Sequence, residues 1–424
     1  MKNVLKISIA LFVTVALGAC GSSETKRAAD GKTGGGESGD KKVISVEPNM
    51  DAETLAQAGE QLMNPATFML ADTALDMSLA KDPENKRAQF YKYAIKRLMT
   101  LKGAGTRFRP FIAANGDVKT YDVESKKFPN SPLKDFLFKG KEDIKTMTQV
   151  QDFLVSYRDA LLEYHTWLRK NQDLNLTLNL NPFVFQGNLR ADELNACEVV
   201  GTSENGLDVK CDYTEIAQRK VNAADMIAIR QMVAGEILYF TIYTAYSAEG
   251  VDRVVRLNKK RNLTGEQILD ILTNNAEFGK LRKDNTLSII TSLGADLMSA
   301  WKWALANQRA LCPAGELAGT RKGQVFENGI CIKYDSETEK YANLADQALM
   351  GAITVKLHKP GTDNEKETRV DYLAWARKPV ADLRDIAPVS FNHCDKADRI
   401  KDNTLGGFYP NGDAEFFLDT KCDD

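Results

Sequence analysis

One pattern constrains the fold more than any other: apolar side chains recur at steps of three and four residues along much of the chain. The most regular run comprises Val150, Phe153, Leu154, Tyr157, Leu161, Tyr164 and Leu168. This spacing places all seven side chains on one face of an amphipathic helix. Together with the further helices described below, it predicts a mainly α protein.

Three more helices have recognisable sequence signals. Asn222 can cap a helix that carries Asp225 in its first turn. Thr264-Gly265-Glu266-Gln267 has the form of a capping box, and residues 285–310 continue with helical spacing. The stretch Met226–Ala248 is the most apolar after the N-terminus, but it contains Arg230, Gln231 and Glu236. We therefore expect it to be a buried core helix and not a membrane span.

Residues 66–98 predict a helical hairpin. Ala66, Met69, Leu70, Thr73 and Met77 follow helical spacing up to Asp82-Pro83, and a second helix starts near Glu84 with Ala88, Tyr91, Ala94, Ile95 and Leu98 on one side. Within this stretch Ala71, Leu75, Ser78, Leu79, Asp82 and Pro83 resemble the second helix of a tetratricopeptide repeat and its closing proline. The resemblance implies a body of stacked helical hairpins, which in that family needs several repeats for stability.

A small β region interrupts the helices at about residues 173–214. Leu174, Leu176, Leu178 and Leu180 alternate with polar residues, which is the period of a strand. Residues 197–211 read as a hairpin with Asn205-Gly206 at its tip. A two-residue turn there would pair Cys211 with Val200, whereas a longer loop centred on Glu204 would pair Cys211 with Cys197.

The last part of the chain, residues 311–424, has a different character. Turn-forming pairs crowd together at 328–329, 360–361 and 410–412. The sequence predicts a small hairpin around Asn328-Gly329, a helix over Tyr341–Met350, and a strand containing Ile353, Val355 and Leu357 that pairs with Val370 and Tyr372. We expect an α+β region that follows the helical body of residues 49–310.

The N-terminus has the parts of a secretory signal over residues 1–19. Lys2 and Lys6 precede an apolar run, Ile7–Ala16, which is too short for a permanent membrane span. The next residues, Leu17-Gly18-Ala19-Cys20, resemble the lipobox of bacterial lipoproteins. The resemblance implies cleavage before Cys20, acylation of Cys20 (palmitate among the chains) and anchoring in the cell envelope. Because Gly21, not Asp, follows the cysteine, the family's sorting rule favours the outer membrane.

Residues 20–48 are expected to be the lipidated cysteine followed by a disordered tether. The segment is rich in Gly, Ser and charged residues and has almost nothing apolar to bury. A coil of this length has a root-mean-square span of roughly 30 Å. The body would thus remain close to a membrane in the periplasm or at the surface. Which of the two it faces is left open.

Six cysteines remain after Cys20, and an even number in an exported chain predicts disulfides. They form three sequence-local pairs, and short loops close most easily. We predict the bridges Cys197–Cys211, Cys312–Cys331 and Cys394–Cys422. The alternative of a zinc site is disfavoured because no Cys-x-x-Cys occurs and only His165, His358 and His393 exist.

The search for chemistry yields few candidates. His165, on the regular helix, could pair with a carboxylate as a general base, but a packing histidine is the ordinary alternative. His393 precedes a cysteine expected to be bridged and is interpreted as a turn residue. The segment from Asp402 to Asp413 is rich in oxygen ligands, yet its spacing does not match a calcium loop. No catalytic, cofactor-binding or metal-ligating residue is predicted.

Two surface features are candidates for binding. Arg253, Arg256, Lys259, Lys260 and Arg261 form a basic run that could contact a phosphate or acidic lipid, or simply be solvated. Trp301 and Trp303, two apart on a helix, face different sides, and one of them could anchor a partner. The formal net charge of −2 argues against general binding of polyanions, and nucleic acid is no expected partner of an exported protein.

We therefore expect a lipid-anchored envelope protein that acts as a helical interaction or scaffold module. Its implied partners are the membrane, through the N-terminal lipid, and another envelope protein; the oligomeric state is left open. One alternative is a tethered solute- or lipid-binding component of a transport system, with a pocket between helices. Another is an envelope hydrolase, since paired carboxylates such as those of glycosidases leave no short sequence motif. An enzyme is the less favoured of these classes.

Overall fold

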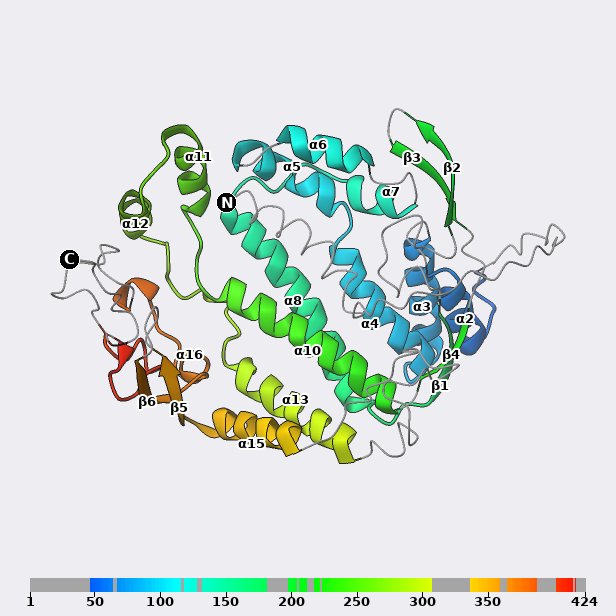
Figure 1. Ribbon diagram of the computed structural model, residues 1–424. Helices are drawn as coiled ribbons and strands as arrows, with labels where there is room; N and C mark the ends of the chain where they lie inside the picture. The colour runs from blue at the N-terminus through cyan, green and yellow to red at the C-terminus, as the bar shows by residue number, and fades with distance from the viewer. Residues whose placement is uncertain are drawn as a thin grey trace, which may run out of the picture. The chain divides into compact units, whose positions relative to one another are not determined.

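The computed structural model describes residues 46–63, 67–115, 118–127, 132–180, 197–203, 206–211, 217–221, 223–306, 336–358, 364–386, 402–414 and 416. Among the described residues helix greatly predominates over strand, which confirms the prediction of a mainly α fold with a small antiparallel hairpin (Figure 1). The chain divides into two compact units. Unit 1 draws on Met1–Thr106, Lys119–Lys141 and Leu174–Asn222, and unit 2 on Arg107–Val118, Glu142–Asp173 and Ala223–Asp424.

Three packed helices form the core of unit 1: α2 (Ala52–Gln61), α3 (Phe68–Lys81) and α4 (Lys86–Thr100). Asp51 caps α2 and Asn85 caps α4, each accepting a hydrogen bond from a backbone N–H of the first turn. The two helices predicted on either side of Asp82-Pro83 are confirmed, and the predicted face of α4 is buried along its length. The helix α2 was not predicted.

The buried face of α3 differs from the periodic set chosen in the sequence. Met69 and Leu70 are more than half exposed, while Ala71, Leu75 and Ser78 are fully buried. Gly59 of α2 partly explains why the Leu75 side of α3 is the buried one. A Cβ at position 59 would lie only 2.7 Å from Leu75 Cδ2. A glycine at this crossing lets α2 and α3 approach closely over Leu75.

A buried carboxylate ties α2 to α4. Glu60 is 1% exposed, and both of its oxygens accept hydrogen bonds at 2.9 Å from Arg87 Nη1. The Tyr91 hydroxyl donates to Glu60 Oε1 at 2.8 Å, and Arg87 Nε donates to Glu53 at the same distance. Burial of the Glu60 charge is therefore compensated by a cation and a hydroxyl from one neighbouring helix.

The remaining helices of this part of the chain are shorter. They are α5 (Ala104–Asn115), which crosses from unit 1 into unit 2, α6 (Val118–Lys127) and α7 (Pro132–Phe138). Gly103 adopts a φ of 69° where the chain leaves α4, and its N–H donates to Phe136 O at 2.8 Å. The positive φ explains why glycine occupies this turn.

Two small antiparallel sheets complete unit 1. The predicted alternating strand is β1 (Leu176–Leu180), and it pairs with β4 (Ala217–Val221), which was not predicted. The predicted hairpin consists of β2 (Cys197–Ser203) and β3 (Gly206–Cys211). Gly206 pairs with Ser203, so it lies in the strand and not at the hairpin tip as expected. A register shift between Val199 and Gly201 then brings Cys211 opposite Cys197.

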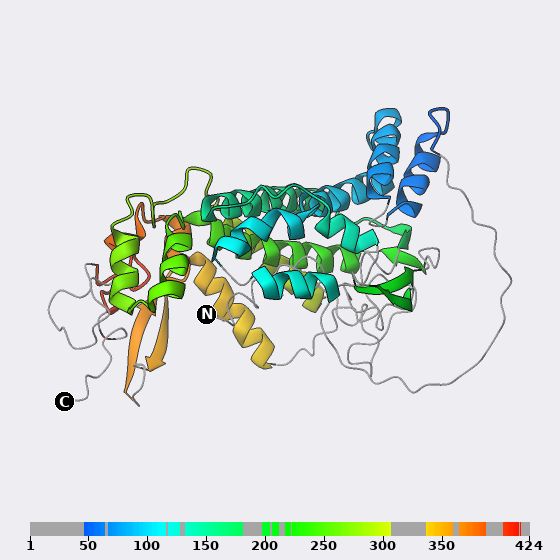
Figure 2. The same cartoon turned by 90° about the horizontal axis from the view of Figure 1, so that it is seen from above.

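Unit 2 is built on two long helices, α8 (Met147–Lys170) and α10 (Ala223–Ala245), which lie side by side (Figures 1 and 2). All seven residues of the strongest sequence pattern are buried on α8. The helix α13 (Ile289–Ala306) packs against α10, and α15 (Ser336–Met350) packs against α13. Helix α13 begins four residues later than predicted. None of the helices among the described residues is long and apolar enough to cross a membrane.

The helices α11 (Val251–Arg261) and α12 (Gly265–Thr273) form a hairpin after α10. The predicted capping box is confirmed, since the Thr264 and Gln267 side chains each accept from the other's backbone N–H. Beyond α12 the chain returns to the end of α10: Ser247 N–H donates to Lys280 O, and Gly279 N–H donates to Ser247 O, both at 2.8 Å.

The C-terminal part of unit 2 contains the predicted strand pair, β5 (Ile353–His358) and β6 (Glu365–Val370), with Ile353 opposite Val370. Tyr372, also predicted to pair, follows the end of β6. Val370, Tyr409 and Ala414 form a small buried cluster. The short helices α16 (Ala374–Arg377) and η1 (Leu383–Asp385) follow the strands.

Two arginines connect this C-terminal part to helix ends. Arg377 donates to Leu349 O at 2.8 Å, at the end of α15, and pairs with Asp371. Arg384 donates to Asn275 O at 3.1 Å, just beyond α12, and its Nε donates to Asp382 at 2.9 Å. Each arginine, held by a nearby aspartate, thus satisfies backbone carbonyls at a helix end.

The signal segment, Cys20, most of the tether and the hairpin expected at 325–332 lie outside the described residues. So do His393 and the cysteines Cys312, Cys331, Cys394 and Cys422.

Candidate functional site

The helix α10 differs from its neighbours because it carries apolar residues on all of its sides. One side, including Ile237 and Phe240, is buried against the other helices of unit 2. The other side carries Ile242 and Tyr243, which are 61% and 57% exposed. We refer to Tyr239, Ile242 and Tyr243 as the α10 aromatic face. The expectation that this stretch would be a buried core helix is therefore right for only one side of it.

The two tyrosines of the α10 aromatic face are in contact. Their ring centroids lie 4.4 Å apart, with the rings tilted by 41°, and Tyr239 also meets Phe240 edge to face at 5.3 Å. Burial, together with the neighbouring Tyr243 hydroxyl, raises the pKa of Tyr239 to about 12. The Tyr239 phenol is consequently neutral at physiological pH, and none of the three residues of the face is acidic or basic.

A buried glutamine fixes the end of α10 below this face. Gln151 of α8 donates through Nε2 to Tyr246 O at 2.7 Å and to Tyr243 O at 3.2 Å. Its Oε1 accepts from Ala248 N–H at 3.0 Å. Because the last carbonyls of a helix have no partner within the helix, a side chain that supplies donors there stabilises the helix end. The backbone of Tyr243 is thus held directly by α8.

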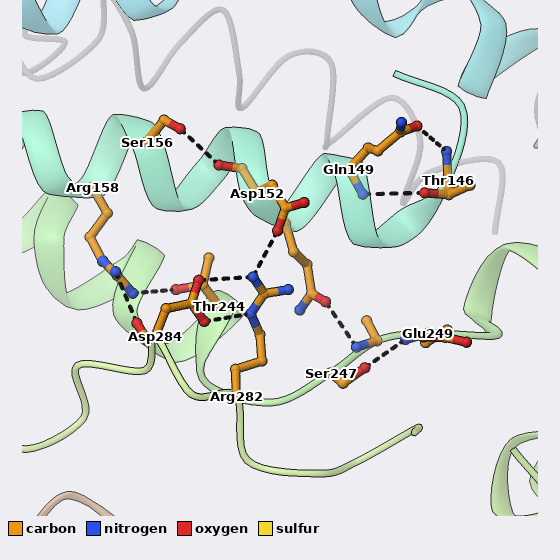
Figure 3. Close-up of polar contacts among 12 residues, drawn as sticks. Thr146, Gln149, Asp152, Ser156, Arg158, Thr244, Ser247, Glu249, Arg282 and Asp284 are labelled. Carbon is orange, nitrogen blue, oxygen red and sulfur yellow. Dashed lines mark hydrogen bonds and ion pairs between the residues drawn. The ribbon is translucent and has the colours of Figure 1, made fainter. Parts of the chain in front are cut away.

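A buried arginine holds the same end from a second point. Arg158 of α8 is 2% exposed and donates to Thr244 Oγ1 at 3.0 Å and to Asp284 O at 3.1 Å (Figure 3). Thr244 in turn donates to Phe240 O at 2.7 Å. The guanidinium links α8, α10 and the segment before α13, so these three parts are fixed relative to one another.

An exposed layer of charges completes this arrangement, as Figure 3 shows. Arg282 donates to Asp152 at 2.8 Å and to both oxygens of Asp284 at 2.9 Å. The hydrogen bond from Arg282 lowers the pKa of Asp284, and burial only partly opposes this. At the start of α8, Thr146 and Gln149 form a reciprocal capping box that was not predicted. We refer to Gln151, Arg158 and Arg282 with their partners as the polar brace.

His165, the one histidine considered for catalysis, does pair with a carboxylate. Its Nε2 lies 3.1 Å from Asp296 Oδ2 of α13, and Arg230 Nε of α10 lies 3.1 Å from the same oxygen without hydrogen-bond geometry. Burial opposes ionisation of Asp296, but the His165 hydrogen bond and the Arg230 charge outweigh it and lower the pKa. Because His165 and Arg230 are both more than nine-tenths buried, a substrate could not reach them. The group joins three helices.

The other candidate residues are accounted for individually. Asp402 accepts from Gly406 N–H at 2.7 Å, and Asp413 pairs with Lys366 at 2.6 Å, so both carboxylates of the oxygen-rich segment, which was not expected to be a calcium loop, are engaged. Within the described ranges no group of His, Cys, Asp or Glu could hold a metal ion. Trp303 is partly exposed on α13, while the Trp301 side chain lies outside what the structure describes. The basic run belongs to α11.

The α10 aromatic face was missed in the sequence, although a signal was present. A helix with apolar residues on every side has more apolar surface than one layer of neighbours can cover. Tyr239 and Tyr243, four residues apart, also share one side of a helix. Apolar composition on every side nevertheless favours a buried helix, and periodicity could not identify a side that its neighbours leave uncovered.

No protein-family model, curated protein or solved structure matches this chain. The functional argument accordingly rests on the α10 aromatic face and on the residues that hold it.

Proposed function

We propose that this chain is a lipid-anchored protein of the cell envelope whose helical body binds a protein partner through the α10 aromatic face. The observation that carries the proposal is the joint exposure of Ile242 and Tyr243 on a helix that is otherwise packed. Tyrosine and large aliphatic side chains in a cluster are typical of the residues that dominate protein interfaces.

The polar brace supports an interface in preference to a mobile apolar segment. In the last turn of α10, Gln151 binds the backbone carbonyl of Tyr243, and Arg158 binds the hydroxyl of the adjacent Thr244. A surface that is already ordered loses less conformational entropy when a partner binds. The α10 aromatic face therefore presents a fixed shape to its partner, and the absence of charge among its three residues favours an apolar surface on that partner.

The proposed location depends on the N-terminus. The match of Leu17-Gly18-Ala19-Cys20 to a lipobox supports acylation at Cys20, and the outer membrane is the proposed site. An oxidising compartment agrees with the β2–β3 register, in which Cys197 and Cys211 are opposite each other. We include the bridges Cys197–Cys211, Cys312–Cys331 and Cys394–Cys422 in the proposal, and we interpret α2–α4 as part of a scaffold of helical hairpins resembling tetratricopeptide repeats.

Site-specific photocrosslinking in intact cells tests the interface. A photoreactive amino acid is placed at Ile242 in one strain and at Thr166, an exposed position on α8 of the same unit, in a matched control. We expect one defined crosslinked protein at position 242 and none at 166. The crosslink should disappear when Tyr243→Ser is added. Equal crosslinking at both positions, or none at 242 in chains that are correctly folded, would contradict the proposal.

Intact-mass analysis of the native chain tests the anchor independently. The expected product begins at residue 20, carries acyl chains on that cysteine, and has six fewer hydrogen atoms than the fully reduced protein, two for each disulfide. An N-terminus at Met1, or an unmodified residue 20, would refute the envelope assignment without touching the interface on α10.

A further inference from the structure

The basic run predicted from the sequence becomes an organised surface on α11. Arg253, Arg256 and Lys260 are spaced by three and four residues, so they lie along one side of the helix, with Lys259 and Arg261 beside them. The opposite side contains Val254, which is buried, and Val251 and Val255, which are partly buried. Arg253 and Lys260 are exposed, so the basic side faces outward except at Arg256, which contacts Asn115 of α5. We refer to Arg253, Lys260 and Arg261, all exposed, as the α11 basic face.

Helix stability does not account for all of these charges. Cations in the last turn, such as Lys260 and Arg261, are favoured by the helix dipole. Arg253 lies in the first turn, where the dipole disfavours a cation. Within the described part of the chain, neither Arg253 nor Lys260 forms an ion pair, whereas Arg256 is engaged by Asp252 at 2.9 Å and by Asn115 at 3.2 Å. The only acidic residue of α11 is therefore already neutralised by Arg256.

The α11 basic face also has a fixed orientation within unit 2. Helix α11 packs against α12, and Arg384 donates to the carbonyls of Thr273 and Asn275 at the end of α12. Asn262, in the left-handed conformation with a φ of 52°, ends α11 and starts the tight connection to α12. The hairpin is thus attached to its unit at the end of α12, through Arg384, and also at Arg256 of α11, which binds Asn115.

We propose that the α11 basic face rests on a membrane surface that contains acidic phospholipids. This inference depends on the proposed lipid anchor, because a tether of residues 20–48 would keep the body within roughly 30 Å of a bilayer. A body tethered this closely meets the bilayer often, and on contact charge complementarity favours an anionic lipid surface. Each Lys or Arg within a Debye length of such a surface, about 10 Å, contributes about 1 kcal/mol. The membrane contact would orient unit 2 and leave the uncharged α10 aromatic face for a protein.

Vesicle flotation tests the proposal with the mature chain carrying Cys20→Ser, so that acyl chains do not contribute. Vesicles of pure phosphatidylcholine are compared with vesicles that contain 30 mol % phosphatidylglycerol as a representative acidic lipid. Both are tested at about 0.1 M salt, where electrostatic attraction reaches about 10 Å. The test variant combines Arg253→Gln, Lys260→Gln and Arg261→Gln. The control combines Lys356→Gln, Arg369→Gln and Lys378→Gln, three exposed cations elsewhere in unit 2 with the same total charge.

We expect the parent chain to bind only the acidic vesicles and the test variant to bind them about 100-fold more weakly, since three charges are removed. The control should change by less than about threefold. Equal losses in the two variants would overturn the proposal, because net charge alone would then be responsible. So would binding of polyglutamate but not of vesicles, which would assign the face to an acidic protein.

The anchor and the basic face can fail separately. Acylated Cys20 in native material combined with no binding to acidic vesicles would refute this inference and leave the proposed anchor intact. Vesicle binding that requires the α11 basic face, in a protein whose residue 20 is never acylated, would refute the anchor and leave the surface contact in place.

Discussion

Helices α2–α4 of unit 1 and helices α8 and α10 of unit 2 use buried polar groups for different purposes. In α2–α4 the carboxylate of Glu60 is neutralised by Arg87 and Tyr91, so the buried charge links two helices side to side. In α8 and α10, Gln151 and Arg158 bind the end of a helix instead. The first arrangement fixes which helices pack together. The second fixes where one helix stops, and so determines which residues of its last turn are exposed.

The difference has a consequence for surface composition. The five apolar residues predicted to share one side of α4 are all buried. That side of the helix is therefore fully covered by its packing partners. Helix α10 has more apolar surface than its partners cover, and Ile242 and Tyr243 remain outside. The exposed apolar side chains of such a helix contribute little to folding. A contiguous exposed apolar patch of this kind is typical of a binding surface.

The largest expected effect concerns the buried carboxylate of unit 1. Replacement Glu60→Ala should destabilise the protein by about 3–5 kcal/mol, because it removes the buried carboxylate that accepts hydrogen bonds from Arg87 and Tyr91. Glu53→Ala, at an exposed partner of the same arginine, should cost less than about 1 kcal/mol. Urea denaturation followed by circular dichroism gives both values. Similar losses of unfolding free energy in the two variants would mean that the buried carboxylate of Glu60 stabilises the fold no more than the exposed carboxylate of Glu53.

A smaller effect is expected at the carboxylate shared by three helices of unit 2. Asp296→Asn should cost roughly 2 kcal/mol at pH 7, because Arg230 then lacks its counter-charge while the His165 hydrogen bond can persist. The pKa of Asp296 is lowered in the folded protein. Its contribution to stability is therefore complete above the unfolded value of about 3.9, and it is lost as the pH falls through the lower folded value.

Denaturation curves of the parent and of Asp296→Asn should accordingly converge as the pH is lowered from 5 towards 3. The matched control is Asp159→Asn, which also removes one carboxylate, at an exposed partner of Arg158. A gap between parent and Asp296→Asn that stayed constant over this pH range would show that the Asp296 charge does not stabilise the fold.

The smallest expected effect on stability lies on the α10 aromatic face. Ile242→Ser should change the free energy of unfolding by no more than about 0.5 kcal/mol, because the side chain is mostly exposed. The same change should weaken partner binding at least 10-fold if the face is an interface core. Ile237→Ser, on the buried side of α10, should destabilise strongly and serves as the contrast. Unaltered partner binding by Ile242→Ser would remove the face from the proposed function.

The sequence predicted helices best where caps and periodicity agreed. The Thr264 capping box and the apolar run of α8 were both confirmed. Helix α2 was missed because it is short and Leu55 is the single large apolar residue within it, so its buried face consists mostly of small residues. Strand β4 was missed because Ala217–Val221 carries three polar residues, two of them charged, in five. The buried side of α3 was misjudged because Met69 and Leu70 are apolar, yet the close approach at Gly59 selected the Leu75 side.

The candidate site was less predictable than the fold. Pairing of His165 with a carboxylate was considered beside the ordinary alternative of a packing histidine. The carboxylate that it contacts, Asp296, lies far away in sequence. Every residue bound by Arg158 except Asp159 is equally distant in sequence. Contacts of this kind depend on how helices pack and leave no local pattern. The basic run was visible in the sequence, whereas its ordering along one side of α11 required the helix bounds.

The links made by Arg377 and Arg384 bear on the order in which the chain assembles. Each guanidinium binds carbonyl oxygens that are presented together only once α15 or α12 has completed its last turn. Contacts across such long sequence separations also form late, because the intervening chain must first be closed. The C-terminal segment can therefore bind these carbonyls only after the helices have formed, and synthesis from the N-terminus makes the helices available before that segment.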